Sequence, residues 1–117
     1  MIEKFGIGID ITTIQKFKKK PFKPNEKFYR LIFSKSEINY CLKYKNPYER
    51  FAGKFALKEA LIKSINTKIR FSEIETTHLN SKPIVSIMKY KTKYNFIASL
   101  SHEKDFAVAV VISVKIK

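Results

Sequence analysis

The sequence predicts an α+β fold, in which an antiparallel sheet packs around a long buried central helix and short helices follow the first strand. Three observations lead to this prediction. Residues 4–11 alternate with the period of two that is typical of a strand. Residues 48–65 are apolar nearly all round at helical spacing, which indicates a buried helix. Residues 71–90 and 94–116 each contain two apolar segments joined by a short polar connection, as in an antiparallel hairpin.

Length and composition favour a single domain that spans residues 1–117. The 117 residues suffice for one core, and 44% of them are hydrophobic. No apolar run approaches the length of about 18 residues that a membrane span needs. The N-terminus lacks a signal-peptide pattern, and the lone Cys41 cannot form an internal disulfide. We therefore expect a cytoplasmic protein that does not interact with membranes.

The net charge of +14 indicates an anionic partner. A surplus of this size attracts polyanions and speeds association with them. Nucleic acid, an acidic protein and a phosphorylated small molecule are all compatible with it, so charge alone does not identify the partner.

The first predicted strand combines an apolar face with a face of small residues around one carboxylate. Its apolar side chains are Phe5, Ile7, Ile9 and Ile11. The opposite face carries Gly6, Gly8 and Asp10. Glycine in a strand often marks the close approach of another group, so the glycines leave open space beside Asp10.

The segment between this strand and the central helix is basic and helical. Residues 15–28 form a basic loop or short helix broken by two prolines, and a short helix is expected at 26–33. The sequence SKSE at 34–37 is a capping box that opens a second helix, which ends near Tyr44. The pair Asn46-Pro47 then marks a break before the central helix.

Two hairpins are expected after the central helix. Segments 71–79 and 83–90 form the first, and segments 94–101 and 106–116 form the second. The last segment is apolar on both faces, so we expect both faces to be covered. Because one chain of this length has few elements to cover both, we predict a homo-oligomer.

The central helix carries four charges that need an explanation: Lys54, Lys58, Glu59 and Lys63. In one interpretation the first two lysines extend their ammonium groups to solvent, and Glu59 pairs with Lys63 one turn later. In the other, an anionic ligand and a cation neutralise them, because buried charge is costly unless it is paired or metal-bound. Asp10 and Glu59 together would suit Mg²⁺, which takes one or two carboxylates plus substrate phosphates.

Five motifs, taken in order, resemble one family. They are GIGIDIT at 6–12, RLIFSKSEINYC at 30–41, RFAGKFALKEALIK at 50–63, NSKP at 80–83 and SLSHEKDFAVAVV at 99–111. Together they closely resemble holo-acyl carrier protein synthase, the small bacterial type of phosphopantetheinyl transferase. The resemblance covers nearly the whole chain and implies the phosphopantetheinyl transferase fold.

The resemblance also implies an activity. Enzymes of this family move the phosphopantetheine arm of coenzyme A to a serine of apo-acyl carrier protein, in support of fatty acid biosynthesis. Adenosine 3′,5′-bisphosphate leaves, and Mg²⁺ is required. The family further implies a homotrimer with active sites between subunits. A base must accept the serine proton. Two candidates remain for this base: Glu59 and a metal-bound water molecule.

Site residues follow by position in the matched motifs. Asp10 and Glu59 resemble the metal ligands, and Glu59 and Lys63 the catalytic residues. The coenzyme would be bound by Lys54, Lys58, Lys63, Ser101 and His102. The basic segment would dock the acidic carrier protein through Lys16, Lys18, Lys19 and Lys20.

Three departures from the family pattern and one alternative function remain. Lys stands at 16 and 54 where Arg is usual, and Ser81 stands where Gly is common. A lysine at 54 gives up bidentate phosphate contacts. The alternative function is a basic single-stranded nucleic-acid-binding module, supported by the interleaved lysines and aromatics of residues 16–30. In the enzyme interpretation we expect no nucleic-acid partner.

Overall fold

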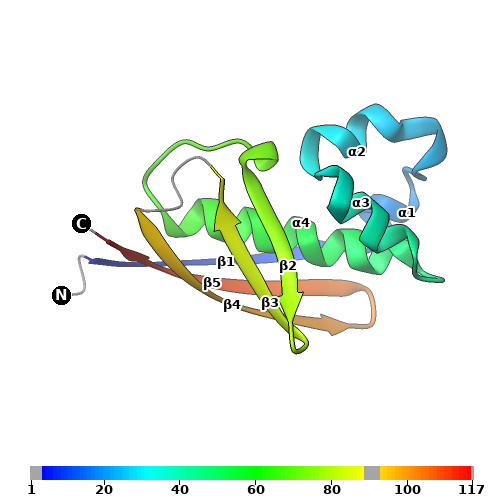
Figure 1. The fold of residues 1–117 in the computed structure, drawn as a ribbon. Helices are drawn as coiled ribbons and strands as arrows, with labels where there is room; N and C mark the ends of the chain where they lie inside the picture. The colour runs from blue at the N-terminus through cyan, green and yellow to red at the C-terminus, as the bar shows by residue number, and fades with distance from the viewer. Residues whose placement is uncertain (1–3, 89–92, 117) are drawn as a thin grey trace.

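The computed structural model describes residues 4–88 and 93–116, and its main sheet has three antiparallel strands (Figure 1). These are β1 (Phe5–Thr13), β4 (Tyr94–Glu103) and β5 (Phe106–Lys115). Their order is β1-β5-β4, so the strand nearest the C-terminus occupies the centre. The three predicted strands are confirmed within two residues at each end.

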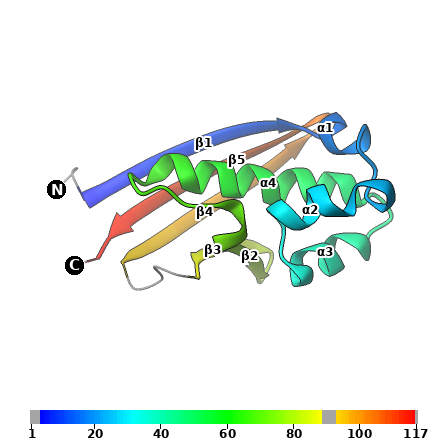
Figure 2. The ribbon, with the colours of Figure 1, turned by 90° about the horizontal axis from the view of Figure 1, so that it is seen from above.

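The central helix α4 (Pro47–Ser64) lies along one face of this sheet, as Figures 1 and 2 show. Gly6 and Gly8 allow the close approach. A Cβ on Gly8 would collide with the carbonyl oxygen of Ala60, and a Cβ on Gly6 with that of Ser64. The sequence predicted open space on the face of β1 that carries these glycines. In the structure, the backbone of α4 fills that space.

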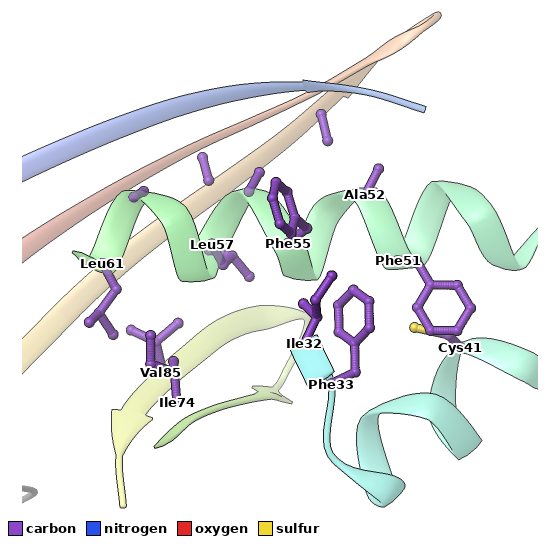
Figure 3. Packing of buried hydrophobic residues seen from close by; sticks show 14 of the residues in the cluster. Ile32, Phe33, Cys41, Phe51, Ala52, Phe55, Leu57, Leu61, Ile74 and Val85 are labelled. Atoms are coloured by element: carbon purple, nitrogen blue, oxygen red, sulfur yellow. The ribbon is translucent and has the colours of Figure 1, made fainter. Parts of the chain in front are cut away.

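Three short helices form a lobe at one end of α4 (Figure 2). They are α1 (Gln15–Lys18), α2 (Glu26–Ile32) and α3 (Lys35–Leu42). The predicted capping box is confirmed: the Ser34 hydroxyl accepts from the backbone N–H of Glu37, whose carboxylate accepts from the Ser34 N–H. Buried aromatic rings join this lobe to α4, among them Phe33 and Phe51 (Figure 3).

A separate two-stranded hairpin, β2 (Ile74–Leu79) and β3 (Lys82–Ile87), packs beside β4. Its turn residues Asn80 and Ser81 have φ values of 52° and 69°. This is the left-handed region that a tight hairpin requires, and it explains why glycine suits position 81. The predicted second strand extended to residue 90, and residues 89 and 90 lie outside the described part.

The sheet face opposite α4 is apolar and open in the single chain. On β5, Ala107, Ala109 and Val111 are fully buried against α4. The other face of the sheet exposes Phe5, Ile7, Ile9, Ile11, Ile97 and Phe106. Within one chain the last strand is therefore covered on one face, and the expected cover of the second face is not supplied by the residues described.

No helix in the described part of the chain has the length and apolarity that crossing a membrane demands.

Candidate functional site

At the contact between β1 and α4, a carboxylate is held by two neighbours. Lys63 Nζ donates to the carbonyl oxygen of Ile9 at 3.0 Å and lies 3.3 Å from Asp10 Oδ1. The Thr12 hydroxyl donates to Asp10 Oδ2. The Asp10 side chain is only 13% exposed, whereas that of Lys63 is 54% exposed. The lysine thus approaches the acid from the solvent side.

Glu59 lies on α4 one turn before Lys63 and is half-buried. Within residues 4–88 and 93–116 it forms no hydrogen bond or ion pair. The i,i+4 pair between Glu59 and Lys63, one of the two interpretations of the sequence, is absent, because Lys63 bonds to β1 instead. Lys63 and Thr12 therefore contact one carboxylate of the predicted pair, whereas the other, Glu59, has no partner among the described residues.

The two carboxylates carried by β1 and α4 fit Mg²⁺. Both carboxylates supply hard oxygen atoms, and the strand and helix that carry them pack directly together. No cluster of three or more His, Cys, Asp or Glu side chains suited to a metal was found among the described residues. A pair of carboxylates matches Mg²⁺, which completes its coordination with water and substrate phosphates.

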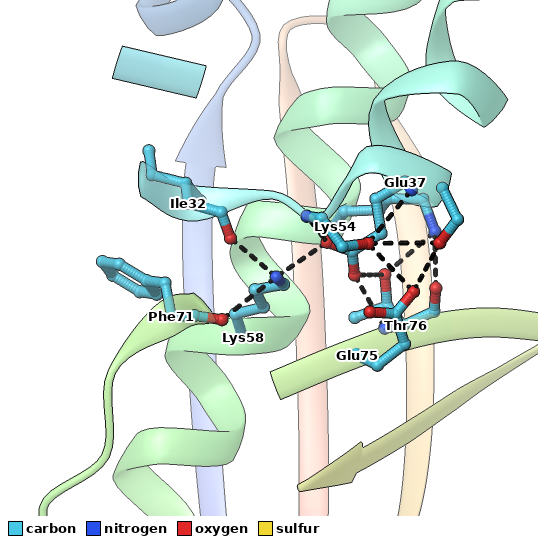
Figure 4. A network of polar contacts seen from close by, with 9 residues as sticks. Ile32, Glu37, Lys54, Lys58, Phe71, Glu75 and Thr76 are labelled. Carbon is cyan, nitrogen blue, oxygen red and sulfur yellow. Dashed lines mark hydrogen bonds and ion pairs between the residues drawn. The ribbon is translucent and has the colours of Figure 1, made fainter. Parts of the chain in front are cut away.

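Lys58 is a buried structural residue (Figure 4). Its side chain is 0% exposed, and its ammonium donates to three oxygens: Glu37 Oε1 at 2.8 Å and the carbonyls of Ile32 and Phe71 at 2.7 and 3.1 Å. Burial lowers the pKa of Lys58, and the Glu37 carboxylate opposes that shift. Because all three N–H groups are used inside the protein, the expectation that Lys58 contacts the coenzyme is corrected.

Glu37 is the acceptor at the centre of this network. Besides Lys58 and the Ser34 N–H, its carboxylate accepts from the backbone N–H and the hydroxyl of Thr76, both at 2.7 Å. It therefore joins α3, α4 and β2 at one point. The hypothesis that an external anion neutralises both buried lysines is wrong for Lys58, whose counterion is in the chain.

Lys54 is also buried, but it borders a cavity. Its ammonium donates to the carbonyl and hydroxyl oxygens of Thr76, at 3.1 and 2.9 Å, and lies 4.7 Å from the centre of the Tyr40 ring. Burial lowers its pKa. A cavity of about 210 Å³ opens beside it between α3 and β2, bordered also by His78. A phosphate group entering this cavity would meet Lys54, so its predicted role remains a proposal.

Ser101 and His102 lie on β4, at the opposite edge of the sheet from Asp10. Ser101 is exposed, and His102 Nε2 lies 3.2 Å from the carbonyl oxygen of Glu49. A Cβ on Gly53 would approach His102 Nε2 to 3.0 Å, so glycine there admits the ring. The predicted site residues thus divide between two edges of the protomer.

The basic segment after β1 is exposed and lies at the helical lobe. Lys16 places its ammonium 4.1 Å from the centre of the Phe55 ring, and Lys20 lies 4.5 Å from that of Phe28. Lys18 and Lys19 are exposed.

Two residues of the site region were missed in the sequence analysis. Thr12 could have been found, because it follows Asp10 by two on the same strand face; Glu37 was seen only as a cap.

Comparisons with known proteins decide the family. A family model described as the 4'-phosphopantetheinyl transferase superfamily matches residues 6–111. The chain belongs to this superfamily. The nucleic-acid-binding alternative gains no support from the comparisons.

Individual relatives of this superfamily match along nearly their whole length. The holo-[acyl-carrier-protein] synthase of Thermodesulfovibrio yellowstonii is 36% identical over 115 residues, covering 96% of this chain and 98% of that protein. The synthase of Chlamydia trachomatis is 32% identical over 117 residues, covering 93% and 98%. The recognition of the family from its motifs is confirmed.

Solved structures confirm the fold. The holo-(acyl-carrier-protein) synthase of Bacillus anthracis, in complex with CoA (3',5'-ADP), superposes with a TM-score of 0.79 at 33% identity, covering 96% of both chains. The Helicobacter pylori synthase, in complex with coenzyme A, gives 0.76 at 34% identity, covering 94% of this chain and 99% of that one. The predicted phosphopantetheinyl transferase fold is therefore correct.

Proposed function

We infer that this chain is a holo-[acyl-carrier-protein] synthase, which transfers the phosphopantetheine arm of coenzyme A to a serine of apo-acyl carrier protein. The similarity to such synthases over nearly the whole chain carries this inference. The contact between β1 and α4 supports it as well: Lys63 pairs with Asp10 there, and Glu59 precedes Lys63 by one turn on α4. We assign the region of Asp10, Glu59 and Lys63 as the active centre.

The transfer exchanges one phosphorus–oxygen bond for another. The serine Oγ of the carrier protein bonds to the phosphorus nearest the pantetheine arm, and the pyrophosphate bond of coenzyme A breaks. Adenosine 3′,5′-bisphosphate leaves with the bonding electron pair, and the serine proton must go to a base. The half-buried Glu59 carboxylate, or a water molecule beside it, serves as that base. Such reactions depend on positioning and on charge neutralisation.

We assign Mg²⁺ to Asp10 and Glu59, and the phosphates of coenzyme A to Lys63 and Lys54. When bound, the metal ion supplies Lewis-acid stabilisation of the charge that develops on the phosphates. Thr12 orients the Asp10 carboxylate through its hydrogen bond. The Lys63 side chain is 54% exposed, so its ammonium can turn toward an anion beside Asp10. Ser101 and His102 are assigned to the nucleotide end of the coenzyme.

The open apolar face of the sheet supports a homotrimer. Ile7 and Ile97 are 68% and 66% exposed there, on opposite edge strands. A contiguous apolar face of this kind marks a protein–protein interface. Ser101 and His102 lie at the sheet edge remote from Asp10, so a site completed by a neighbouring subunit would reunite the two groups.

We propose that the basic segment with Lys16, Lys18, Lys19 and Lys20 docks the acidic carrier protein. Its charges are exposed and follow directly on the strand that carries Asp10. Complementary charge acts mainly on the rate of encounter and is screened by salt.

A cytoplasmic location is consistent with the single free Cys41, which is buried.

The activity is tested by incubating the chain with coenzyme A, MgCl₂ and purified apo-acyl carrier protein, followed by intact-mass measurement of the carrier. We expect the carrier to gain the mass of one phosphopantetheine group. A carrier whose acceptor serine is replaced by alanine serves as the control. An unchanged carrier mass with an active reference synthase working in parallel would overturn the proposed function.

A further inference from the structure

Lys63 and a divalent cation compete for the same carboxylate. In the structure the Lys63 ammonium already neutralises Asp10, at 3.3 Å from Oδ1, and is fixed by a second bond to the carbonyl of Ile9. Thr12 occupies the other oxygen of Asp10. Each oxygen of the carboxylate assigned to the metal thus already has one partner in this structure.

The geometry also shows where Lys63 does not bind. Glu59, one turn earlier on the same helix, would be its ordinary i,i+4 partner. Within the ranges 4–88 and 93–116 that carboxylate has no partner, although it is half-buried. Lys63 therefore reaches across to β1 and leaves Glu59 free. A divalent cation that binds to Glu59 and Asp10 would therefore have to share Asp10 with the Lys63 ammonium.

We propose that Lys63 is an exchange residue, which holds Asp10 while no metal is bound and moves to the phosphates of coenzyme A when metal and coenzyme bind together. The proposal rests on the function proposed above. Two cations on one carboxylate repel each other, so the metal alone binds weakly. An incoming pyrophosphate gives Lys63 an alternative partner, and its departure releases Asp10 to the metal.

This exchange makes metal and coenzyme binding cooperative. A coupling between two ligands is reciprocal, so coenzyme A must tighten metal binding by the same factor as the metal tightens coenzyme binding. The coupling passes through the Lys63 side chain, which is 54% exposed and can therefore exchange its bonds to β1 for a bond to an incoming anion. Lys63 is thus both a phosphate ligand and the residue that links the two binding events.

The test measures Mn²⁺ binding by electron paramagnetic resonance in the absence of turnover, because carboxylate sites for Mg²⁺ also accept Mn²⁺. Lys63→Met removes the competing charge and keeps the stem. Without coenzyme, we expect Lys63→Met to bind Mn²⁺ on the order of threefold to tenfold more tightly than the wild type, since exposed ion pairs are weak. Coenzyme A should tighten Mn²⁺ binding to the wild type more than to this variant.

Two controls separate the possible outcomes. Lys68→Met removes an equal charge from an exposed lysine elsewhere and should leave Mn²⁺ affinity unchanged. Lys63→Arg restores the positive charge and should restore weak binding. Equal or weaker Mn²⁺ binding by Lys63→Met, or no measurable binding, would overturn the exchange. If Asp10→Asn leaves Mn²⁺ binding intact, the assignment of the metal site itself fails, whereas loss of binding in that variant with no effect of Lys63→Met overturns the exchange alone.

Discussion

Replacing Lys58 by methionine should destabilise the fold strongly. Methionine keeps most of the side-chain volume but leaves the Glu37 carboxylate without its counterion, at 0% side-chain exposure. Removing one partner of a buried ion pair typically costs about 3–5 kcal/mol, because the remaining charge is uncompensated. The carbonyls of Ile32 and Phe71 also lose the donor that ties them to α4. Lys58 therefore contributes to stability and not to coenzyme binding.

The predicted magnitude can be measured by thermal and denaturant unfolding. For a domain of this size, a change of 1 kcal/mol shifts the melting temperature by about 4 °C, so we expect a decrease of roughly 12–20 °C. Adding Glu37→Gln to Lys58→Met removes the orphaned charge and should recover part of the loss. Lys68→Met, on the surface, should change stability by less than about 0.5 kcal/mol. All variants must be compared at one protein concentration, because oligomer stability depends on it.

The opposite outcome has a clear meaning. If Lys58→Met kept wild-type stability but raised the KM for coenzyme A, the side chain would have to reach the ligand. Lys58 would then be assigned to coenzyme binding, as its position in the matched motif implies.

Three further predictions concern pH, assembly and docking. Burial raises the pKa of the Cys41 thiol to about 12 from an ordinary value of 9.0, so its contribution to stability is present below pH 9 and is lost between pH 9 and about 12. The stability gap between wild type and Cys41→Ala should narrow over that window in urea titrations; a constant gap would contradict it. Ile7→Lys should yield monomers by light scattering, whereas Leu31→Lys, at a 74% exposed leucine off the sheet, should not; a persistent trimer in Ile7→Lys would refute the interface. Changing Lys18–Lys20 to serine should raise the KM for carrier protein and flatten its salt dependence, with no such effect from the matched control of exposed lysines Lys35, Lys45 and Lys68. Unchanged carrier affinity together with loss of tight binding to single-stranded RNA would favour the nucleic-acid alternative.

The elements could be predicted because their signals are local. Alternation fixed the faces of β1, and the capping box at Ser34 marked the start of α3 to the residue. The period of the central helix indicated burial on all sides, which its near-complete burial confirms. Each of these patterns lies within a short segment of the chain. In such a segment the backbone geometry of the helix or strand alone determines which side chains share a face.

The partners of the charged residues could not be predicted, because they are distant in sequence. Glu37 and Lys58 are 21 residues apart, and Lys63 and Asp10 are 53 apart. Helical spacing favoured Glu59 as the partner of Lys63, but tertiary packing of α4 on β1 offered a better-placed acceptor. Lys58 is enclosed on another side of α4, by Ile32, Glu37 and Phe71. Periodicity identified the charged positions correctly and could not say which of them face the ligand.

The most direct test of the active centre is the rate of phosphopantetheine transfer by Asp10→Asn and Glu59→Gln, followed by intact mass of the carrier protein. Both substitutions keep the side-chain size and remove the charge, and thermal unfolding verifies that the variants fold. We predict that each loses most of the wild-type activity and that excess EDTA stops the wild-type reaction. Full activity in either folded variant, or undiminished transfer in EDTA, would contradict the assignment of Asp10 and Glu59 to the metal.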